Sequence, residues 1–167
     1  MCGIAGFCSL KRCYTDRQSF WENILVSMHE KLIHRGGDAS GIYLTPHAGL
    51  SHQRLSIRDI THGAQPMIRH RDGADYAIVY NGEIGASFVS RLNGIFSFAI
   101  WDGAAKQLFL YRDRVGTKPL FYHAKDGELV FASEPKALFC FPDLSPAITE
   151  NSLRELLAVG PARTPGC

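Results

Sequence analysis

The chain has 167 residues, of which 46% are hydrophobic and 20% are charged, and its formal net charge at pH 7 is +2. This length supplies the core of one domain, and the composition excludes an intrinsically disordered chain. The small net charge gives no reason to expect a nucleic acid or a membrane as partner, and no apolar run reaches the roughly 18 residues of a membrane-spanning helix. Because the N-terminal residues lack the basic region of a signal peptide, we expect a cytoplasmic protein.

The five cysteines do not follow the pattern of a disulfide framework or of a zinc site. Their number is odd and no secretion signal precedes them, so reduced thiols are expected. The cysteines near the start are not spaced as Cys-x-x-Cys pairs. We therefore expect no metal in this domain, and we interpret Cys8, Cys13 and Cys140 as small apolar fillers or surface thiols.

The first predicted elements are a strand and a helix. Residues 3–10 are apolar and mixed with glycine, which predicts a buried strand. Apolar residues then recur at three- and four-residue spacing between residues 20 and 32. This pattern predicts a helix that starts near Arg17, with Thr15 or Asp16 as its N-cap. Two glycines within residues 35–38 end the helix.

Short strands dominate the rest of the chain. We predict them at residues 41–45, 50–57, 76–80, 95–101, 107–111, 120–123 and 129–132. The dipeptides Asp102-Gly103 and Asp126-Gly127 indicate hairpin turns between several of them. Residues 69–71 are interpreted as a solvated loop. The aromatic side chains of the strands are expected to be mostly buried, namely Phe96, Phe98, Trp101, Phe109, Tyr111, Phe121 and Tyr122.

Two further helices are predicted at residues 134–139 and 150–158, the second with Thr149 as its N-cap. A helix, then many strands, then helices is the order of an α+β fold in which helices pack on antiparallel sheets. The order alone leaves the topology open. Residues 161–167 have the composition of a linker.

Cys2 can supply two catalytic groups if Met1 is removed. Its thiol attacks only as a thiolate, and a free thiol titrates at about 8.5. An α-amino group titrates at about 7.7–8.0, so part of the population is a neutral base near pH 7. Nucleophile and proton acceptor would then share one residue, as in N-terminal nucleophile (Ntn) hydrolases. The alternative is that Cys2 merely begins a strand.

Two further segments contain groups suited to a reaction site. The Asn81 side-chain amide and the Gly82 backbone N–H can stabilise an oxyanion. The alternative for Asn81-Gly82 is a type I′ hairpin turn. Arg54 can clamp a carboxylate with two parallel hydrogen bonds, and its alternative is a solvated strand residue paired with a surface acid.

These segments belong to a longer ordered series. It consists of Met-Cys-Gly-Ile-Ala-Gly at the start and of residues 34–41, 52–59, 63–67, 80–84, 91–96, 112–120 and 132–134. The series resembles the class II glutamine amidotransferases, and in particular the N-terminal glutaminase domain of asparagine synthetases. The resemblance covers nearly the whole chain.

The resemblance implies an α+β fold of the Ntn hydrolase type, a four-layer αββα sandwich over residues 1–160. Residues 161–167 would be a truncated linker toward an absent synthetase domain. The implied reaction is hydrolysis of L-glutamine to glutamate and ammonia through a thioester on Cys2. The ammonia would serve asparagine synthesis in the synthetase domain, present in cis or in trans. ATP and magnesium are expected only there, and a homodimer is a further option.

The resemblance also implies the roles of individual residues. Three of them would be catalytic, with the thiol as nucleophile and two donors at the oxyanion: Cys2, Asn81 and Gly82. Four would bind glutamine, by a clamp on the α-carboxylate, a clamp on the α-ammonium and backbone groups of the pocket: Arg54, Glu83, Leu55 and Ile57. Fixing both charged ends of the substrate would hold its amide at the nucleophile.

The sequence departs from the family pattern after Ile84. A stretch containing a helix and a strand is missing there, together with the aspartate that normally completes the α-ammonium site. Glu83 would hold the ammonium alone, and losing one charge-assisted hydrogen bond costs about 1.5–3 kcal/mol. The missing stretch leaves open a non-catalytic domain with a structural or assembly role. Another type of amidotransferase, for phosphoribosyl or sugar-phosphate acceptors, is a third interpretation, and the segments at 54–57 and 116–120 argue against it.

Overall fold

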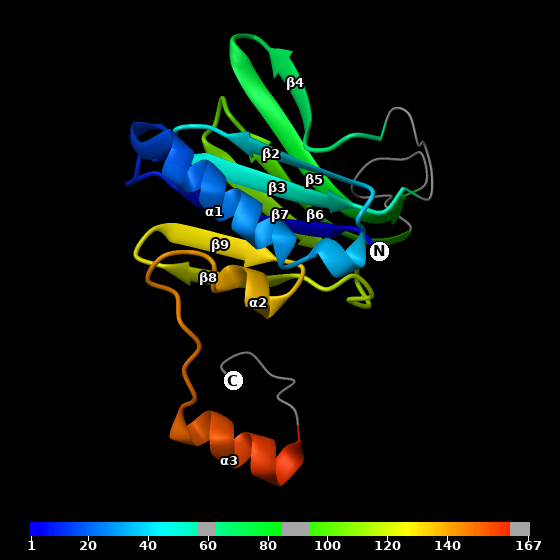
Figure 1. Ribbon diagram of the computed structural model, residues 1–167, viewed down its shortest axis with the longest axis vertical. Helices are drawn as coiled ribbons and strands as arrows, with labels where there is room; N and C mark the ends of the chain where they lie inside the picture. Colours follow the sequence, from blue (N-terminus) through cyan, green and yellow to red (C-terminus); the bar gives the residue numbers. More distant parts are fainter. Residues whose placement is uncertain (57–62, 85–93, 161–167) are drawn as a thin grey trace.

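The structure is a computed structural model that describes residues 1–56, 63–84 and 94–160. Its described residues form two antiparallel sheets (Figure 1). The first sheet has the strand order β2-β3-β1-β9-β8, with bounds β1 (Gly3–Ser9), β2 (Ala39–Leu44), β3 (Ala48–Arg54), β8 (Phe121–Lys125) and β9 (Glu128–Ala132). The second has the order β4-β5-β6-β7, with bounds β4 (Met67–Arg71), β5 (Ala74–Ile84), β6 (Gly94–Asp102) and β7 (Gln107–Arg112).

Helices cover one outer face of this pair of sheets. They are α1 (Gln18–Glu30) and α2 (Pro135–Leu138), which lie on the first sheet (Figure 1). Trp21, Leu25 and Met28 of α1 pack against Phe7 of β1 in one core cluster. Because side chains alternate along a strand, the other face of β1 points toward the second sheet. Helices and two sheets therefore form successive layers, with β1 in the middle of the first sheet.

A second core cluster fills the space between the sheets. It contains Ile4 of β1 and Leu50 of β3 from the first sheet, and Val79 of β5 and Trp101 of β6 from the second. All four side chains are buried. The even-numbered residues of β1 and β3 therefore face the second sheet, and this alternation decides which polar side chains can meet between the sheets.

The start of α1 differs from the prediction. Tyr14–Arg17 form a 3₁₀ turn, and neither Thr15 nor Asp16 caps α1, whose N-cap residue Arg17 makes no side-chain capping bond. The cause is the buried Tyr14 ring, which lies 4.6 Å from the Phe7 ring. Packing of this ring fixes the chain before the helix, and local capping chemistry does not decide where α1 begins.

The interpretation of residues 69–71 as a loop is wrong, because they belong to strand β4. This strand pairs with β5 from Met67↔Ile78 to Arg71↔Ala74. The connecting residues Asp72 and Gly73 have φ values of 51° and 77°, as a type I′ turn requires. All residues of β4 are exposed, so the strand shows no apolar alternation in the sequence.

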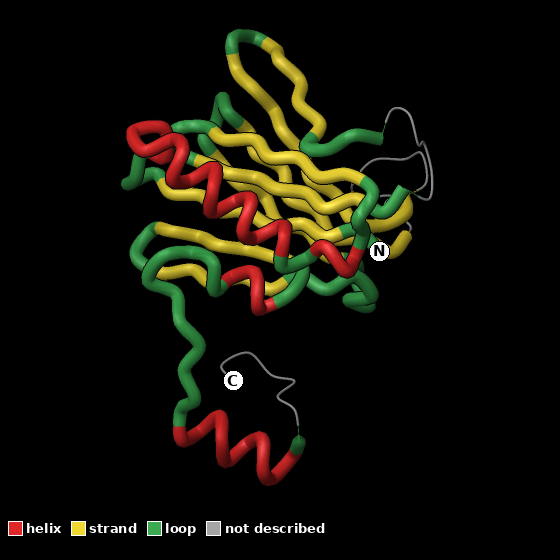
Figure 2. Tube along the Cα trace, in the orientation of Figure 1, coloured by secondary structure: helices red, strands yellow, loops and turns green. Residues whose placement is uncertain are grey.

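Burial of the aromatic residues was predicted correctly for only some of them. Phe96, Phe98 and Trp101 are buried, whereas Phe121 and Tyr122 of β8 are exposed. Phe109 and Tyr111 of β7 are 38% and 36% exposed. Among the described residues no helix covers the outer face of the second sheet (Figure 2). The described part of the chain therefore shows three layers, αββ.

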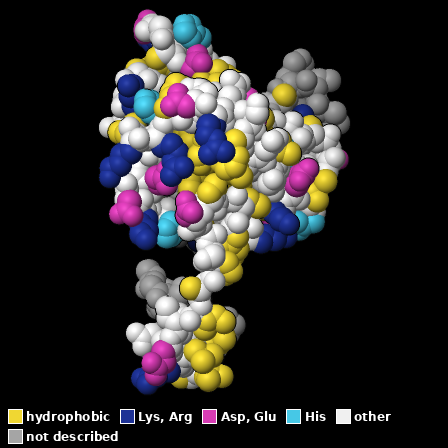
Figure 3. All heavy atoms as spheres, turned by 60° about the vertical axis from the view of Figure 1, so that its left-hand side comes forward, with side chains coloured by type: hydrophobic (Ala, Val, Ile, Leu, Met, Phe, Trp, Pro, Cys, Tyr) yellow, Lys and Arg dark blue, Asp and Glu magenta, His cyan; other side chains and the backbone are white. Residues whose placement is uncertain are grey.

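Helix α3 (Glu150–Val159) stands apart from the sheets on an extended arm (Figure 2). Thr149 caps it as predicted, since its side chain accepts a hydrogen bond from the Ser152 N–H. Figure 3 shows apolar side chains gathered on one side of this helix, and Leu153 and Leu156 are about half exposed. No helix in the described part of the chain is long and apolar enough to cross a membrane.

Candidate active site

Cys2 lies directly before β1, at the end of the central strand of the first sheet. Its thiol contacts the backbone just past β3: Sγ is 3.4 Å from the Leu55 nitrogen and 3.7 Å from the Leu55 oxygen. The Leu55 N–H donates to the sulfur, and the thiol can donate to the Leu55 carbonyl. The nucleophile predicted from the sequence is therefore held at the end of β3, half-buried.

Arg54 reaches the same end of the sheet. The β1–β3 register runs to Gly3↔Gln53, so continuing it by one residue places Cys2 opposite Arg54. As an even-numbered residue of β3, Arg54 belongs to the face that points to the second sheet, and it is only 8% exposed. Its backbone oxygen accepts a hydrogen bond of 3.1 Å from the Asp38 N–H. A solvated strand residue, the alternative for Arg54, does not fit this burial.

His52 links the two sheets next to the site. Its side chain is fully buried, and its Nε2 lies 3.2 Å from the Tyr80 backbone oxygen on β5. Burial lowers the pKa of the His52 imidazole to about 4, so the ring is neutral at pH 7. A neutral ring with its proton on Nε2 donates to the carbonyl. This bond ties β3, next to Arg54, to β5, next to Asn81.

Asn81 and Gly82 lie inside strand β5, so the alternative of a hairpin turn is wrong. They pair with Ser97 and Phe96 of β6. Gly82 has a φ of 154°, and a Cβ there would lie 2.2 Å from the Ile95 backbone oxygen, so only glycine fits without a shift. Pairing with a long neighbouring strand overrides the turn preference of the Asn-Gly dipeptide.

The side chain of Asn81 is buried, with 1% exposed. Its Nδ2 has no hydrogen-bond partner among the described residues. A buried donor without a partner costs about 1–3 kcal/mol, so such groups are rare in folded proteins. As an odd-numbered residue of β5, Asn81 shares the inward face with Val79 of the inter-sheet core. The unpaired amide therefore lies between the sheets.

Two predicted binding groups cannot be placed. Ile57 lies outside the described residues, and so does the side chain of Glu83, whose backbone pairs with Ile95 at the end of β5. Of the seven predicted site residues, the structure brings Cys2, Arg54 and Leu55 together at one end of the first sheet. Asn81 lies on the facing strand of the second sheet, beside the His52 contact.

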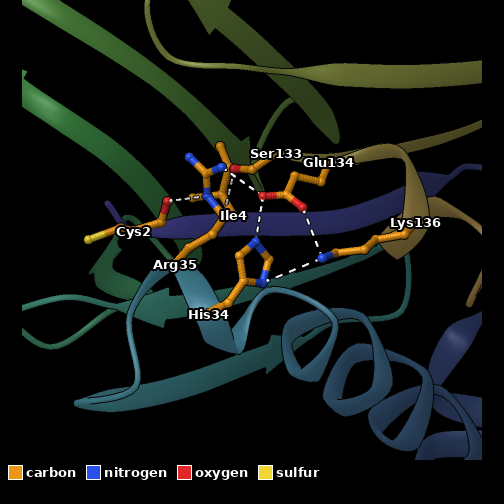
Figure 4. A network of polar contacts seen from close by, with 7 residues as sticks. All are labelled: Cys2, Ile4, His34, Arg35, Ser133, Glu134 and Lys136. Carbon is orange, nitrogen blue, oxygen red and sulfur yellow. Dashed lines mark hydrogen bonds and ion pairs between the residues drawn. The ribbon is translucent and has the colours of Figure 1, made fainter.

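A polar network lies behind Cys2 that the sequence did not predict (Figure 4). The Arg35 guanidinium donates from Nε to the Cys2 backbone oxygen at 3.0 Å and from Nη1 to Glu134 Oε1 at 2.8 Å. Glu134 also contacts His34 at 2.9 Å and Lys136 at 3.1 Å. Arg35 and Glu134 both lie in segments of the ordered series, but they are 99 positions apart, so only the fold brings them together.

The network keeps Glu134 ionised. Burial alone would raise the pKa of its carboxyl, but hydrogen bonds from Arg35, His34 and Lys136 outweigh this and lower the pKa to about 2. Arg35 is itself buried, so its charge requires this partner. No group of three His, Cys, Asp or Glu side chains suited to a metal ion occurs in the described part of the chain.

The structure thus places a cysteine at the start of the central strand of a two-sheet core, as expected of a glutamine amidotransferase domain. The chain belongs to this family: the sequence model of the glutamine amidotransferase domain matches residues 1–84 and 83–167. Glutamine phosphoribosylpyrophosphate amidotransferase from Bacillus subtilis has a similar structure, with a TM-score of 0.63 at 16% identity, over 83% of this chain and 43% of that one. The predicted α+β fold with two packed sheets is thereby confirmed, and the described residues show three of the four predicted layers.

The sequence relatives include asparagine synthetases. The glutamine-hydrolysing asparagine synthetase 3 of Bacillus subtilis (strain 168) is 33% identical over 99% of this chain and 32% of its own length. The amidase chry2 of Gibberella zeae is 30% identical over 93% of this chain and 29% of its own length. The chain thus spans about a third of the length of these relatives. The resemblance to the glutaminase domain of asparagine synthetases is confirmed.

The comparisons also locate the departure from the family pattern. The family match falls into two pieces that meet at residues 83–84, at the end of β5. The alignment with asparagine synthetase 3 runs over 199 residues, more than the 167 of this chain. That relative therefore carries residues that have no counterpart here, as the missing stretch after Ile84 predicted.

Proposed function

We propose that this domain hydrolyses the side-chain amide of L-glutamine with Cys2 as the nucleophile. After removal of Met1, the free α-amine takes the thiol proton, and the thiolate attacks the amide carbon. The C–N bond then breaks, the nitrogen leaves as ammonia with the transferred proton, and a γ-glutamyl thioester remains on Cys2. Water attacks the thioester, which releases glutamate and restores the thiol.

The observation that carries this proposal is the buried Asn81 amide without a partner. In the attack on the amide, negative charge develops on the carbonyl oxygen, and donors aimed at that oxygen lower the barrier. Asn81 Nδ2 would be such a donor, and the backbone N–H of the neighbouring Gly82 would be the second. The missing side chain of Gly82 lets the backbone of β6 lie close beside it. An unpaired donor that weakens the resting fold gains its partner only in the reaction.

Substrate binding would use the groups around the Cys2 end of β3. Arg54 would hold the α-carboxylate by two parallel hydrogen bonds, and Glu83 would hold the α-ammonium. Backbone groups of Leu55 and Ile57 would line the pocket, and the contact of Cys2 Sγ with the Leu55 backbone supports this placement. The two clamps would present the amide to the thiol.

The ammonia would pass to a synthetase domain, in cis through residues 161–167 or in trans. Similarity to asparagine synthetases supports asparagine formation from aspartate as the parent reaction. ATP and magnesium would bind in that synthetase domain, and a homodimer is compatible with the proposal. The reaction would take place in the cytoplasm, where Cys2 stays reduced.

A non-catalytic role is the second candidate, and the break at residues 83–84 favours it. In that case the domain would keep the fold but lack a complete glutamine pocket. The two candidates differ in the reactivity of Cys2 toward a glutamine analogue, because only the catalytic candidate needs a pocket that selects this thiol.

Intact mass after incubation with 6-diazo-5-oxo-norleucine tests the proposal. This analogue alkylates the nucleophile with loss of N₂ and leaves a stable thioether. We expect one adduct on protein that has lost Met1, no adduct on Cys2→Ala, and an unchanged adduct on the control Cys13→Ala. Cys8 should stay unmodified, because burial raises the pKa of its thiol to about 11. A folded protein that retains Met1 or takes up no adduct would refute the catalytic proposal.

A further inference from the structure

The N-terminal position of the nucleophile creates a positioning problem. Once Met1 is removed, Cys2 is attached to the protein through its carbonyl side alone. The last paired residue of β1 is Gly3, so Cys2 lies beyond the sheet pairing. Rotation about the bonds between Gly3 and Cys2 would swing the thiol and the α-amine away from the substrate. A misplacement of 1 Å can reduce a rate about 100-fold, so this residue needs an anchor.

Arg35 supplies a contact at the required point. Its Nε donates to the Cys2 backbone oxygen at 3.0 Å, which fixes the orientation of the peptide plane after Cys2 (Figure 4). Ile4, two residues after Cys2, is fixed separately, because its N–H donates to Ser133 Oγ at 3.0 Å and its carbonyl accepts from the Ser133 N–H at 2.8 Å. Arg35 therefore acts on the nucleophile residue itself, while Ser133 holds the strand behind it.

Glu134 fixes Arg35 in turn. The Nη1 donor and Glu134 Oε1 are 2.8 Å apart, and the Arg35 side chain is 8% exposed. In Figure 4 the guanidinium lies between the Cys2 carbonyl and the Glu134 carboxylate. Glu134 is held from its other side by Lys136, 3.1 Å away. The planar guanidinium can contact both groups at once in a fixed geometry, whereas a lysine ammonium is a single point charge on a flexible chain.

We propose that Arg35, held by Glu134, is a positioning residue that orients the Cys2 thiol and α-amine toward the glutamine amide. The inference rests on the proposed function. Arg35 contacts the carbonyl of the nucleophile residue, so it would act on the rate of the chemical step. Binding of the substrate depends on other groups, above all Arg54 on β3.

The test separates binding from chemistry with the same glutamine analogue. Labelling of Cys2 by 6-diazo-5-oxo-norleucine is followed over time at several concentrations, which yields KI for binding and kinact for the covalent step. For Arg35→Lys and for Glu134→Gln we expect kinact to fall at least about tenfold while KI stays within about threefold. In the double variant kinact should be little lower than in either single variant, because both substitutions disrupt the same Cys2–Arg35–Glu134 contact.

A surface ion pair of the same composition provides the matched control. Arg12 and Glu128 are 2.6 Å apart, and the Arg12 side chain is 42% exposed. Glu128 pairs with Ser9, at the end of β1 that is remote from Cys2. Arg12→Lys and Glu128→Gln should leave kinact and KI unchanged. Alkylation by iodoacetamide serves as a second readout, since this small reagent needs no oriented nucleophile. Its rate at Cys2 should change by less than about threefold in Arg35→Lys, which retains the positive charge.

Two results would show that Arg35 does not position Cys2. An unchanged kinact in folded Arg35→Lys and Glu134→Gln protein, or equal losses toward both reagents, would overturn the inference. If Arg35→Lys does not fold, Glu134→Gln alone decides, because it leaves the Cys2 contact partner in place. A wild-type protein that reacts with iodoacetamide at Cys2 but not with the glutamine analogue would refute the proposed function instead, so the two failures are distinguishable.

Discussion

Stability toward acid should depend on one histidine between the sheets. His52 is fully buried, and burial lowers its pKa from 6.5 to about 4. At 1.36 kcal/mol per pKa unit, this difference corresponds to roughly 3 kcal/mol of folding free energy. The unfolded chain binds a proton at His52 below about pH 6.5, whereas the native chain does so only near pH 4. The native state therefore loses stability as the pH falls through this window.

The perturbation is His52→Gln, whose amide can still donate to the Tyr80 carbonyl but does not titrate. Above pH 6.5 the contribution of His52 is constant, so the two proteins should differ by a fixed amount. Between pH 6.5 and 4 the wild-type free energy of unfolding should fall by up to about 1.4 kcal/mol per pH unit more than that of the variant. Burial also lowers the pKa of His29, but this effect is common to both proteins and cancels in the comparison.

Urea unfolding at a series of pH values measures this difference, with linear extrapolation at each pH. His123→Gln is the matched control, because His123 is exposed on β8 and this variant should follow the wild-type profile. Parallel pH profiles for wild type and His52→Gln would refute the reasoning, since they would mean that the ring takes up a proton equally in both states.

Three further results are expected. Asn81→Ala should lower kcat for glutamine hydrolysis about 10²–10³-fold with little change in KM, as steady-state kinetics would show, because the amide acts on the developing oxyanion. Gly36→Ala should destabilise the fold by about 1–3 kcal/mol in urea unfolding, because its Cβ would lie 2.4 Å from the backbone of β3. The control Gly37→Ala has open space around its Cβ and should stay within about 1 kcal/mol of wild type. Glutamine should be preferred over 4-carbamoylbutanoate, which lacks the α-ammonium, by less than about 100-fold in kcat/KM, because Glu83 would bind that group alone. A larger preference would contradict the incomplete ammonium site.

Periodicity in the sequence predicted those elements that the core itself requires. Apolar spacing located α1 because Trp21, Leu25 and Met28 pack on the first sheet. It located β6 because one side of that strand fills the space between the sheets. Each of these elements has one face in the core and the other face outside it. In such elements the spacing of apolar residues in the sequence matches the pattern of buried side chains.

The errors lie where contacts remote in sequence decide the structure. Strand β4 is exposed throughout, so apolar periodicity gives no sign of it, and the Asp72-Gly73 turn is the local feature that could have indicated it. The Asn-Gly dipeptide at residue 81 favours a turn locally, but pairing with β6 extends β5 through it. The Arg35–Glu134 contact joins residues that are 99 positions apart in the chain. No local pattern contains that information.

The position of the candidate site explains how the family's chemistry can survive the missing stretch. Cys2 and Arg54 are placed by the pairing of β1 with β3, which lies wholly before residue 84. Asn81 is placed by the pairing of β5 with β6, which continues on both sides of the break, to Ile84↔Gly94. The break at residues 83–84 therefore bears on the proposed site for the substrate's ammonium group, and it leaves the proposed nucleophile Cys2 and the proposed oxyanion donor Asn81 where the strand pairings hold them.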